Sequence, residues 1–145
     1  MLIVSIIGLL AILAIPAFSR QRMQAQNAAF VNDLRILADV LEQVALTEGD
    51  YPPNAAVGVV PNGVEPYLHR TFDWSREAPI GGYWDWDRAP DRDTKLFEVY
   101  AGISIVGPAR TSAQMRDIDR TVDDGNLYTG AFRARPGGYM YILEE

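Results

Sequence analysis

The chain contains no cysteine and only one histidine, His69. The missing cysteines exclude disulfide bridges, cysteine-ligated zinc and a cysteine nucleophile. One histidine leaves little for metal or general-base chemistry, and we interpret it as a loop residue. The net charge of −6 argues against nucleic acid as a partner, because such proteins normally carry a basic stripe. The sequence also lacks a glycine-rich phosphate loop and a serine–histidine–aspartate set, so we do not expect an enzyme.

Charge is also missing from residues 1–18. As a helix this run would span about 27 Å, close to the hydrocarbon thickness of a bilayer. A secretory signal peptide would begin with basic residues and end in a small-residue cleavage site. A core helix that is apolar on every side would need a larger protein around it. We therefore expect residues 1–18 to be a membrane anchor.

Two features of the anchor leave alternatives open. Arg20 and Arg22 follow it directly, so the positive-inside rule alone would place the rest of the chain in the cytoplasm. Charges preceding Met1 would decide this orientation, and we expect the natural chain to have them. Gly8 and Pro16 predict a kink or local melting, or they reflect the tolerance of membrane helices for both residues.

Residues 19–48 predict the amphipathic half of the same helix. Apolar residues recur there at intervals of three and four, as on a helix face that packs against a sheet. The stripe consists of Phe30, Leu34, Leu37, Leu41 and Val44, with Val31, Ala38 and Ala45 beside it. Gly49 predicts the end of the helix, and Pro52 and Pro53 prevent it from resuming. An unbroken helix over residues 1–47 would be about 70 Å long.

Residues 49–145 predict a C-terminal domain. The pattern indicates an irregular connection over 51–79, strands over 83–87 and 96–106, and a hairpin of 127–133 with 139–143. Thr111 or Ser112 is expected to cap a short helix whose inward residues are Met115, Ile118 and Val122. The predicted fold class is therefore α+β, a long N-terminal helix packed on a small antiparallel sheet.

The anchor resembles the N-terminal helix of type IV pilin-like proteins, most of all that of type II secretion pseudopilins. The resemblance lies in residues 3–18 (IVSIIGLLAILAIPAF), with Gly8 and Pro16 at the family's helix-breaking glycine and proline. Residues 48–52 (EGDYP) also resemble the stretch that ends the long helix of major pseudopilins. The family's basic leader, cleavage site and glutamate would lie before Met1, so we expect this sequence to start inside the precursor.

The resemblance implies a non-enzymatic filament subunit with a pilin-like fold. Such a subunit is held in the bacterial inner membrane by one span, with its C-terminal domain in the periplasm or on a surface fibre. The implied partners are further copies of the chain, other pseudopilins, an inner-membrane assembly platform, prepilin peptidase acting on the precursor, and membrane lipid. The expected assembly surface is the apolar face of residues 2–15, with Ile3, Gly8, Leu9, Ile12 and Pro16 as its main residues.

Carboxylates cluster at the end of the predicted short helix, with Asp117 and Asp119 on the helix, where they would point apart, and Asp123 and Asp124 just beyond it. Oxygen-rich loops suit Ca²⁺, and the resemblance implies a calcium site in a C-terminal loop. The cluster is not an EF-hand, because Tyr128 stands at its twelfth position, and it lacks the usual Asp-Pro-Trp-Gly and Ser-x-Asp patterns of major pseudopilins. The two alternatives are a structural calcium site and a solvated helix end with an Asp-Gly turn.

The segment 83–87 alternates so that Trp84 and Trp86 share one strand face and Asp85 and Asp87 the other. The tryptophans predict a core, or alternatively a strip on which sugars stack. The aspartates would lie about 6.5–7 Å apart, but no cleft or acid–base partner accompanies them as in a glycosidase. The rival functions are thus an anchored extracytoplasmic glycan-binding module and an exported hydrolase with an uncleaved anchor.

Overall fold

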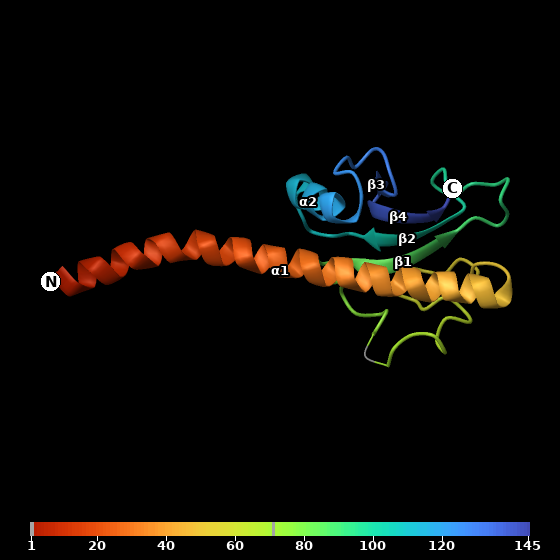
Figure 1. The fold of residues 1–145 in the computed structure, drawn as a ribbon, viewed down its shortest axis with the longest axis horizontal. Coiled ribbons are helices and arrows are strands. Elements are labelled where there is room, and N and C mark those ends of the chain that lie inside the picture. The colour runs from red at the N-terminus through yellow and green to blue at the C-terminus, as the bar shows by residue number, and fades with distance from the viewer. Residues whose placement is uncertain (1, 71) are drawn as a thin grey trace.

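The computed structural model describes residues 2–70 and 72–145, without the side chains of residues 2, 3, 13 and 14. Within these residues it has two helices and a four-stranded antiparallel sheet of order β1-β2-β4-β3. The sheet lies along the C-terminal half of the first helix, and the other half projects from the domain (Figure 1). The predicted α+β fold class is confirmed. The elements are α1 (Leu2–Glu48), β1 (Tyr83–Arg88), β2 (Ala101–Val106), α2 (Ser112–Val122), β3 (Phe132–Arg135) and β4 (Gly138–Glu144).

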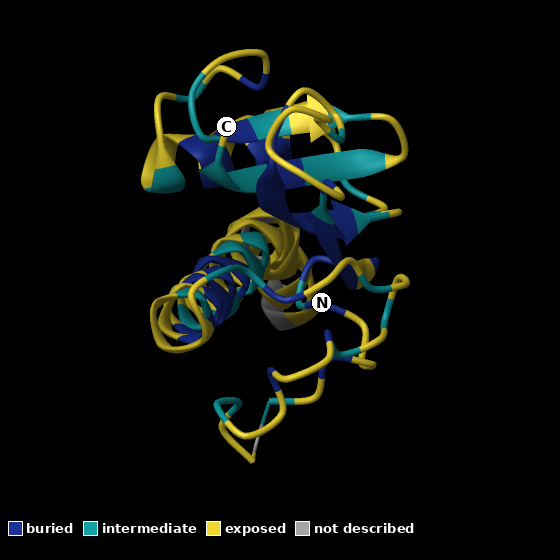
Figure 2. Cartoon of the chain, turned by 90° about the vertical axis from the view of Figure 1, so that its right-hand side faces the viewer, coloured by how far each residue is buried: buried dark blue, intermediate teal, exposed yellow. Residues whose placement is uncertain are grey.

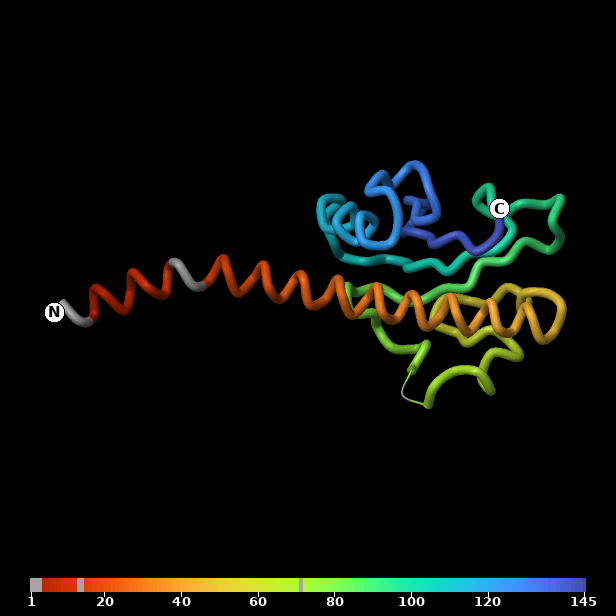
Figure 3. The backbone as a smooth tube through the Cα atoms, viewed as in Figure 1, coloured from red at the N-terminus to blue at the C-terminus, as the bar shows by residue number. Residues whose placement is uncertain are grey.

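Helix α1 is the single rod that the sequence predicts, and its 47 residues correspond to a length of about 70 Å. Pro16 lies inside the helix without ending it. Figure 3 shows a gentle bow in the projecting half, and the helix continues beyond it. One proline removes one backbone hydrogen bond, and the remaining ladder keeps the rod continuous. Local melting at this residue is therefore not seen in the structure.

The C-terminal half of α1 packs on the sheet through the predicted apolar stripe. Phe30 stacks on Trp84 with ring centroids 5.1 Å apart and meets Phe132 edge-on at 6.4 Å. Gly49 ends the helix at φ +88°, where its N–H donates to the carbonyl of Ala45 at 2.9 Å, as in a left-handed cap. The buried residues of the stripe are Phe30, Val31, Leu34, Leu37, Ala38, Leu41 and Val44.

Strand β1 gives the sheet two different faces. Trp84 and Trp86 face α1 and are buried, which confirms the core interpretation and leaves neither ring open for a sugar to stack on. Figure 2 shows buried residues in dark blue on the domain half of α1 and on the strands. The outer edge of β1 is covered, because Ala55 and Gly58 donate to the carbonyls of Trp86 and Trp84 at 3.3 and 2.8 Å. A covered edge cannot pair with another chain.

Two strands begin later than predicted. Strand β2 starts at Ala101 rather than at residue 96, because Phe97 and Glu98 have φ values of +52° and +70° and form a tight turn. Positive φ is incompatible with an extended strand. The hairpin also starts at Phe132 rather than at residue 127. The carboxylate of Asp123 accepts hydrogen bonds from the backbone N–H groups of residues 131 and 132 and holds this stretch in a loop.

Helix α2 lies beside α1 at the end of the domain nearest the projecting half (Figure 1). Thr111 is its N-cap, as predicted, with its hydroxyl accepting from the N–H of Gln114 at 3.2 Å. The side-chain amide of Gln114 donates to Oδ1 of Asn27 at 2.7 Å and ties the first turn of α2 to α1. Met115 and Ile118 are fully buried, as predicted.

Candidate functional site

The projecting half of α1 is apolar and yet exposed. Leu9 is 67% exposed and Ile12 69% exposed. Gly8 and Pro16 lie on the same exposed half, whereas the side chain of Ile3 lies outside the described residues. This part of α1 is long and apolar enough to cross a membrane. Because apolar surface in water costs about 25 cal/mol per Å², the segment needs lipid or protein around it.

Three carboxylates meet where α2 ends. One ligand oxygen from each of Asp119, Asp123 and Asp124 lies within 4.8 Å of the others. Asp117, the fourth residue predicted from the sequence, turns elsewhere and accepts a hydrogen bond from Nη1 of Arg120 at 2.7 Å. Residues two apart on a helix do not share a face, so α2 directs Asp117 and Asp119 to different sides.

Asp119 is the unusual member of this cluster. It is fully buried, and neither of its carboxylate oxygens accepts a hydrogen bond of normal geometry from the described residues, although the backbone N–H of Gly125 partly offsets the rise in its pKa. Burial, followed by the charges of Asp124 and Asp123, raises the pKa of Asp119 to about 6. A buried carboxylate without a partner is destabilising unless it is protonated or neutralised by a cation. At neutral pH Asp119 is mostly ionised, and the described residues supply this buried carboxylate with no ion-pair partner.

The loop around Asp119 holds the other two carboxylates in place. Asp124 accepts from the hydroxyl of Thr129 and from the N–H of Asn126, both at 2.7 Å. Asp123 accepts from the backbone N–H of Ala131, just before β3, and from that of Phe132, the first residue of β3. Carboxylate oxygens are the hard ligands that Ca²⁺ prefers. The donor set therefore fits a divalent cation.

The aspartates of β1 form a separate cluster on the sheet face away from α1. Asp85 and Asp87 are each 6% exposed, and Nη2 of Arg135 lies 2.9 and 3.2 Å from their carboxylates. Ser104 donates to Asp87 at 2.5 Å, and the ring of Phe97 covers the Arg135 guanidinium at 4.4 Å. Both carboxylates are thus engaged inside the protein. This geometry gives no support to the glycosidase hypothesis.

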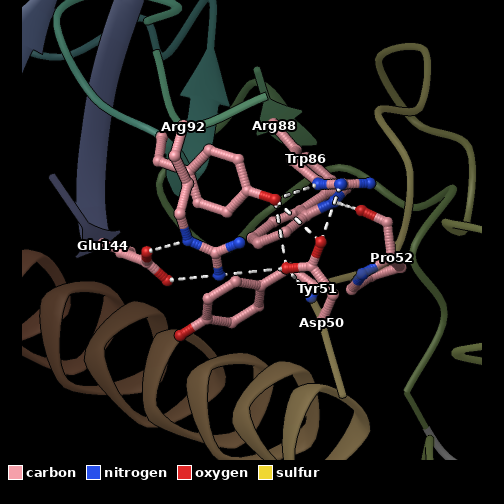
Figure 4. A network of polar contacts seen from close by, with 8 residues as sticks. Asp50, Tyr51, Pro52, Trp86, Arg88, Arg92 and Glu144 are labelled. Carbon is pink, nitrogen blue, oxygen red and sulfur yellow. Dashed lines mark hydrogen bonds and ion pairs between the residues drawn. The ribbon is translucent and has the colours of Figure 1, made fainter. Parts of the chain in front are cut away.

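A second polar network joins the end of α1 to the sheet (Figure 4). The carboxylate of Asp50 accepts from Arg88 at 2.9 Å, Arg92 at 3.3 Å and the hydroxyl of Tyr100 at 2.9 Å. Arg92 also donates to Glu144 at 2.7 Å. Burial opposes ionisation of Asp50, but the hydrogen bond from Tyr100 and the two guanidinium charges lower its pKa below the ordinary value. The network therefore ties the C-terminal end of α1 to strands β1 and β4 and to the segment between β1 and β2.

Sequence reasoning missed the arginines of these networks, which are Arg88, Arg92 and Arg135. It also missed Arg110, which lines a pocket with Arg22 where α2 begins. Each of these arginines stands far along the chain from the residues that it meets. No local spacing relates such residues. The only indication in the sequence would have been a comparison of the number of arginines with the number of carboxylates in each segment.

Comparison with known proteins assigns no family to the chain. It matches no family model, no curated protein and no solved structure. The exposed apolar half of α1 and the acidic cluster are therefore the features of the chain that bear on its function.

Proposed function

We propose that this chain is a subunit of a type IV pilin-like filament, of the type II secretion pseudopilus kind. The projecting half of α1 anchors the subunit in the bacterial inner membrane. The subunit then assembles with further copies and other pseudopilins. Prepilin peptidase would process its precursor, and an inner-membrane platform would drive its assembly. The supporting observation is that one unbroken helix is apolar and exposed at one end but buried in the domain at the other.

Assembly of such a filament exchanges one apolar environment of the projecting half for another. In the bilayer, lipid covers the projecting half of α1, and in a fibre the corresponding halves of neighbouring copies cover it. Apolar surface then stays out of water throughout assembly, which avoids a penalty of about 25 cal/mol per Å². The domain covers only the C-terminal half of the rod (Figure 1). A bundle of rods can therefore form without moving the domain off its own helix.

The substitution Leu9→Lys tests this proposal. A lysine at the centre of a membrane helix is unfavourable by about 2.5–3.5 kcal/mol, and it places a charge inside the expected fibre core. We expect loss of membrane retention and of fibres in cells that contain the assembly machinery. Fractionation measures the retention, and electron microscopy measures the fibres.

Leu46→Lys is the matched control, because Leu46 lies on the same helix and is 87% exposed on the domain half. It should leave fibres and membrane retention unchanged. The fluorescence of the buried tryptophans reports whether the domain is folded in both variants. Normal fibres in the Leu9→Lys variant would contradict the proposal.

A second role, binding of a structural cation, is favoured by the buried and unpartnered carboxylate of Asp119. We propose that Ca²⁺ bridges Asp119, Asp123 and Asp124 and so joins the end of α2 to the loop before β3. The charge of the ion would supply the compensation that Asp119 lacks among the described residues. The ion would stabilise the domain and take no part in a reaction.

Calcium titration followed by thermal melting tests this role. Calcium at a hundredfold excess over its dissociation constant should add about 2.7 kcal/mol to the free energy of unfolding. Asp119→Asn should abolish the rise in melting temperature. Asp117→Asn should retain it, because Asp117 pairs with Arg120 outside the cluster. Absence of any rise in the unmodified protein at millimolar calcium would refute the site.

A further inference from the structure

A pocket of about 340 Å³ lies where α2 meets α1. It has two arginines in its walls and no carboxylate. Arg22 comes from α1, and Arg110 comes from the residues just before α2. The remaining wall residues are Ser19, Met23, Gln26 and Gln114.

The arginines of this region lack counter-charges. Among the described residues, Arg20, Arg22 and Arg110 take part in no ion pair. The Nε atom of Arg110 is also buried, and it has no hydrogen-bond partner among the residues that the structure describes. The whole chain has a net charge of −6. The positive charge of this pocket is therefore a local exception to the acidic character of the chain. Because N–H donors of its arginines lack acceptors, the pocket suits an anion.

The position of the pocket indicates where that anion comes from. Arg22 follows the last apolar residue of the projecting half, Phe18, by about 6 Å along the helix axis. Lipid phosphates occupy the interfacial layer just outside the hydrocarbon core. Helix α2 lies at the end of the domain nearest the projecting half (Figure 1), which brings Arg110 to the same level as Arg22. If α1 crosses a membrane, the pocket lies at the depth of the phosphate groups.

We propose that this pocket binds the phosphate of an anionic phospholipid, with Arg22 and Arg110 donating to its oxygens. The guanidinium group suits this role, because its fixed fork of N–H donors matches phosphate geometry. The site depends on the membrane anchoring proposed above. It adds a lipid preference to that anchoring, since a bound headgroup holds the α2 end of the domain against the membrane surface until assembly withdraws the subunit.

The test uses the full chain in detergent micelles that contain equal amounts of phosphatidylglycerol and phosphatidylcholine, with the retained lipids counted by native mass spectrometry. We expect the protein to retain phosphatidylglycerol preferentially. Arg22→Gln and Arg110→Gln should each lower this retention about fivefold, because an arginine at an anionic surface contributes about 1 kcal/mol. Arg35→Gln is the matched control, an exposed arginine of α1 about 25 Å beyond Phe18. Arg35→Gln should leave the retention of phosphatidylglycerol unchanged.

Three results would overturn the site. They are equal retention of the two lipids by the unmodified protein, an equal effect of Arg110→Gln and Arg35→Gln, and displacement of the lipid by free glycerol phosphate at the same concentration. The last would identify a general anion site rather than a headgroup site. Vesicle flotation separates this inference from the anchoring. A chain that floats with both kinds of vesicle but shows no lipid preference refutes only the pocket, whereas a chain that floats with neither refutes the anchor.

Discussion

The two halves of α1 contain the same kinds of apolar residues in opposite environments. Leu9 is 67% exposed, whereas Leu41 is fully buried. Apolar side chains surround the helix in residues 4–12 and 15–18, but they form a single stripe in residues 30–44. One sheet can bury a stripe, whereas a helix that is apolar on every side needs lipid or several protein neighbours. The placement of polar residues, rather than apolar content, therefore separates the two halves.

The sharpest test of this difference compares Phe30→Ala with Leu9→Ala. Phe30→Ala removes a ring between Trp84 and Phe132 and should lower the free energy of unfolding of the domain by about 3–5 kcal/mol. Leu9→Ala should change it by less than about 0.5 kcal/mol, because Leu9 lies on the exposed, projecting half of α1. Urea unfolding of the full chain in mild detergent, followed by tryptophan fluorescence, measures both values. Similar losses in the two variants would show that the halves are not energetically separate.

A smaller loss of stability is expected from a substitution at the junction between α1 and the sheet. Asp50→Asn weakens charge-assisted hydrogen bonds from Arg88, Arg92 and Tyr100, and should lower the free energy of unfolding by roughly 1–2 kcal/mol near neutral pH. The exposed ion pair of Asp117 with Arg120 provides the control. In the absence of calcium, Asp117→Asn should lower the free energy of unfolding by less than about 0.5 kcal/mol.

The same junction predicts a pH dependence. The pKa of Asp50 is lower in the folded chain than its ordinary value of 3.8. Its contribution to stability is therefore fully present above that value and is lost as the pH falls below it through the folded pKa. Asp50→Asn should remove this contribution to the acid dependence. An unchanged acid profile in the variant would exclude Asp50 as its source.

The smallest loss of stability is expected from a substitution where the buried half of α1 ends. Gly49 has a φ of +88° with nothing within 4 Å of an added Cβ, so Gly49→Ala meets no clash and only backbone strain. An alanine in this conformation should lower the free energy of unfolding by about 1 kcal/mol. Gly8→Ala, in the projecting half, should leave the domain unaffected. A gain in stability on Gly49→Ala would contradict the left-handed cap.

Much of the fold could be predicted because it depends on spacing between near neighbours in the sequence. The stripe around Phe30, the cap at Thr111 and the buried Trp84 and Trp86 all follow from helix and strand periods. The turn at Phe97 could not be predicted, because a phenylalanine gives no sequence indication of positive φ. In the structure its ring covers the guanidinium of Arg135, a contact between distant segments.

By itself the sequence determined that one helix would be apolar on all sides at its start and striped further on, because periodicity is a property of consecutive residues. Only the tertiary structure decided which charges meet. It brought Arg135 to Asp85 and Asp87, and it placed Arg110 in one pocket with Arg22 where α2 packs against α1. Side chains that are distant along the chain become neighbours only through packing, and no local pattern records that packing.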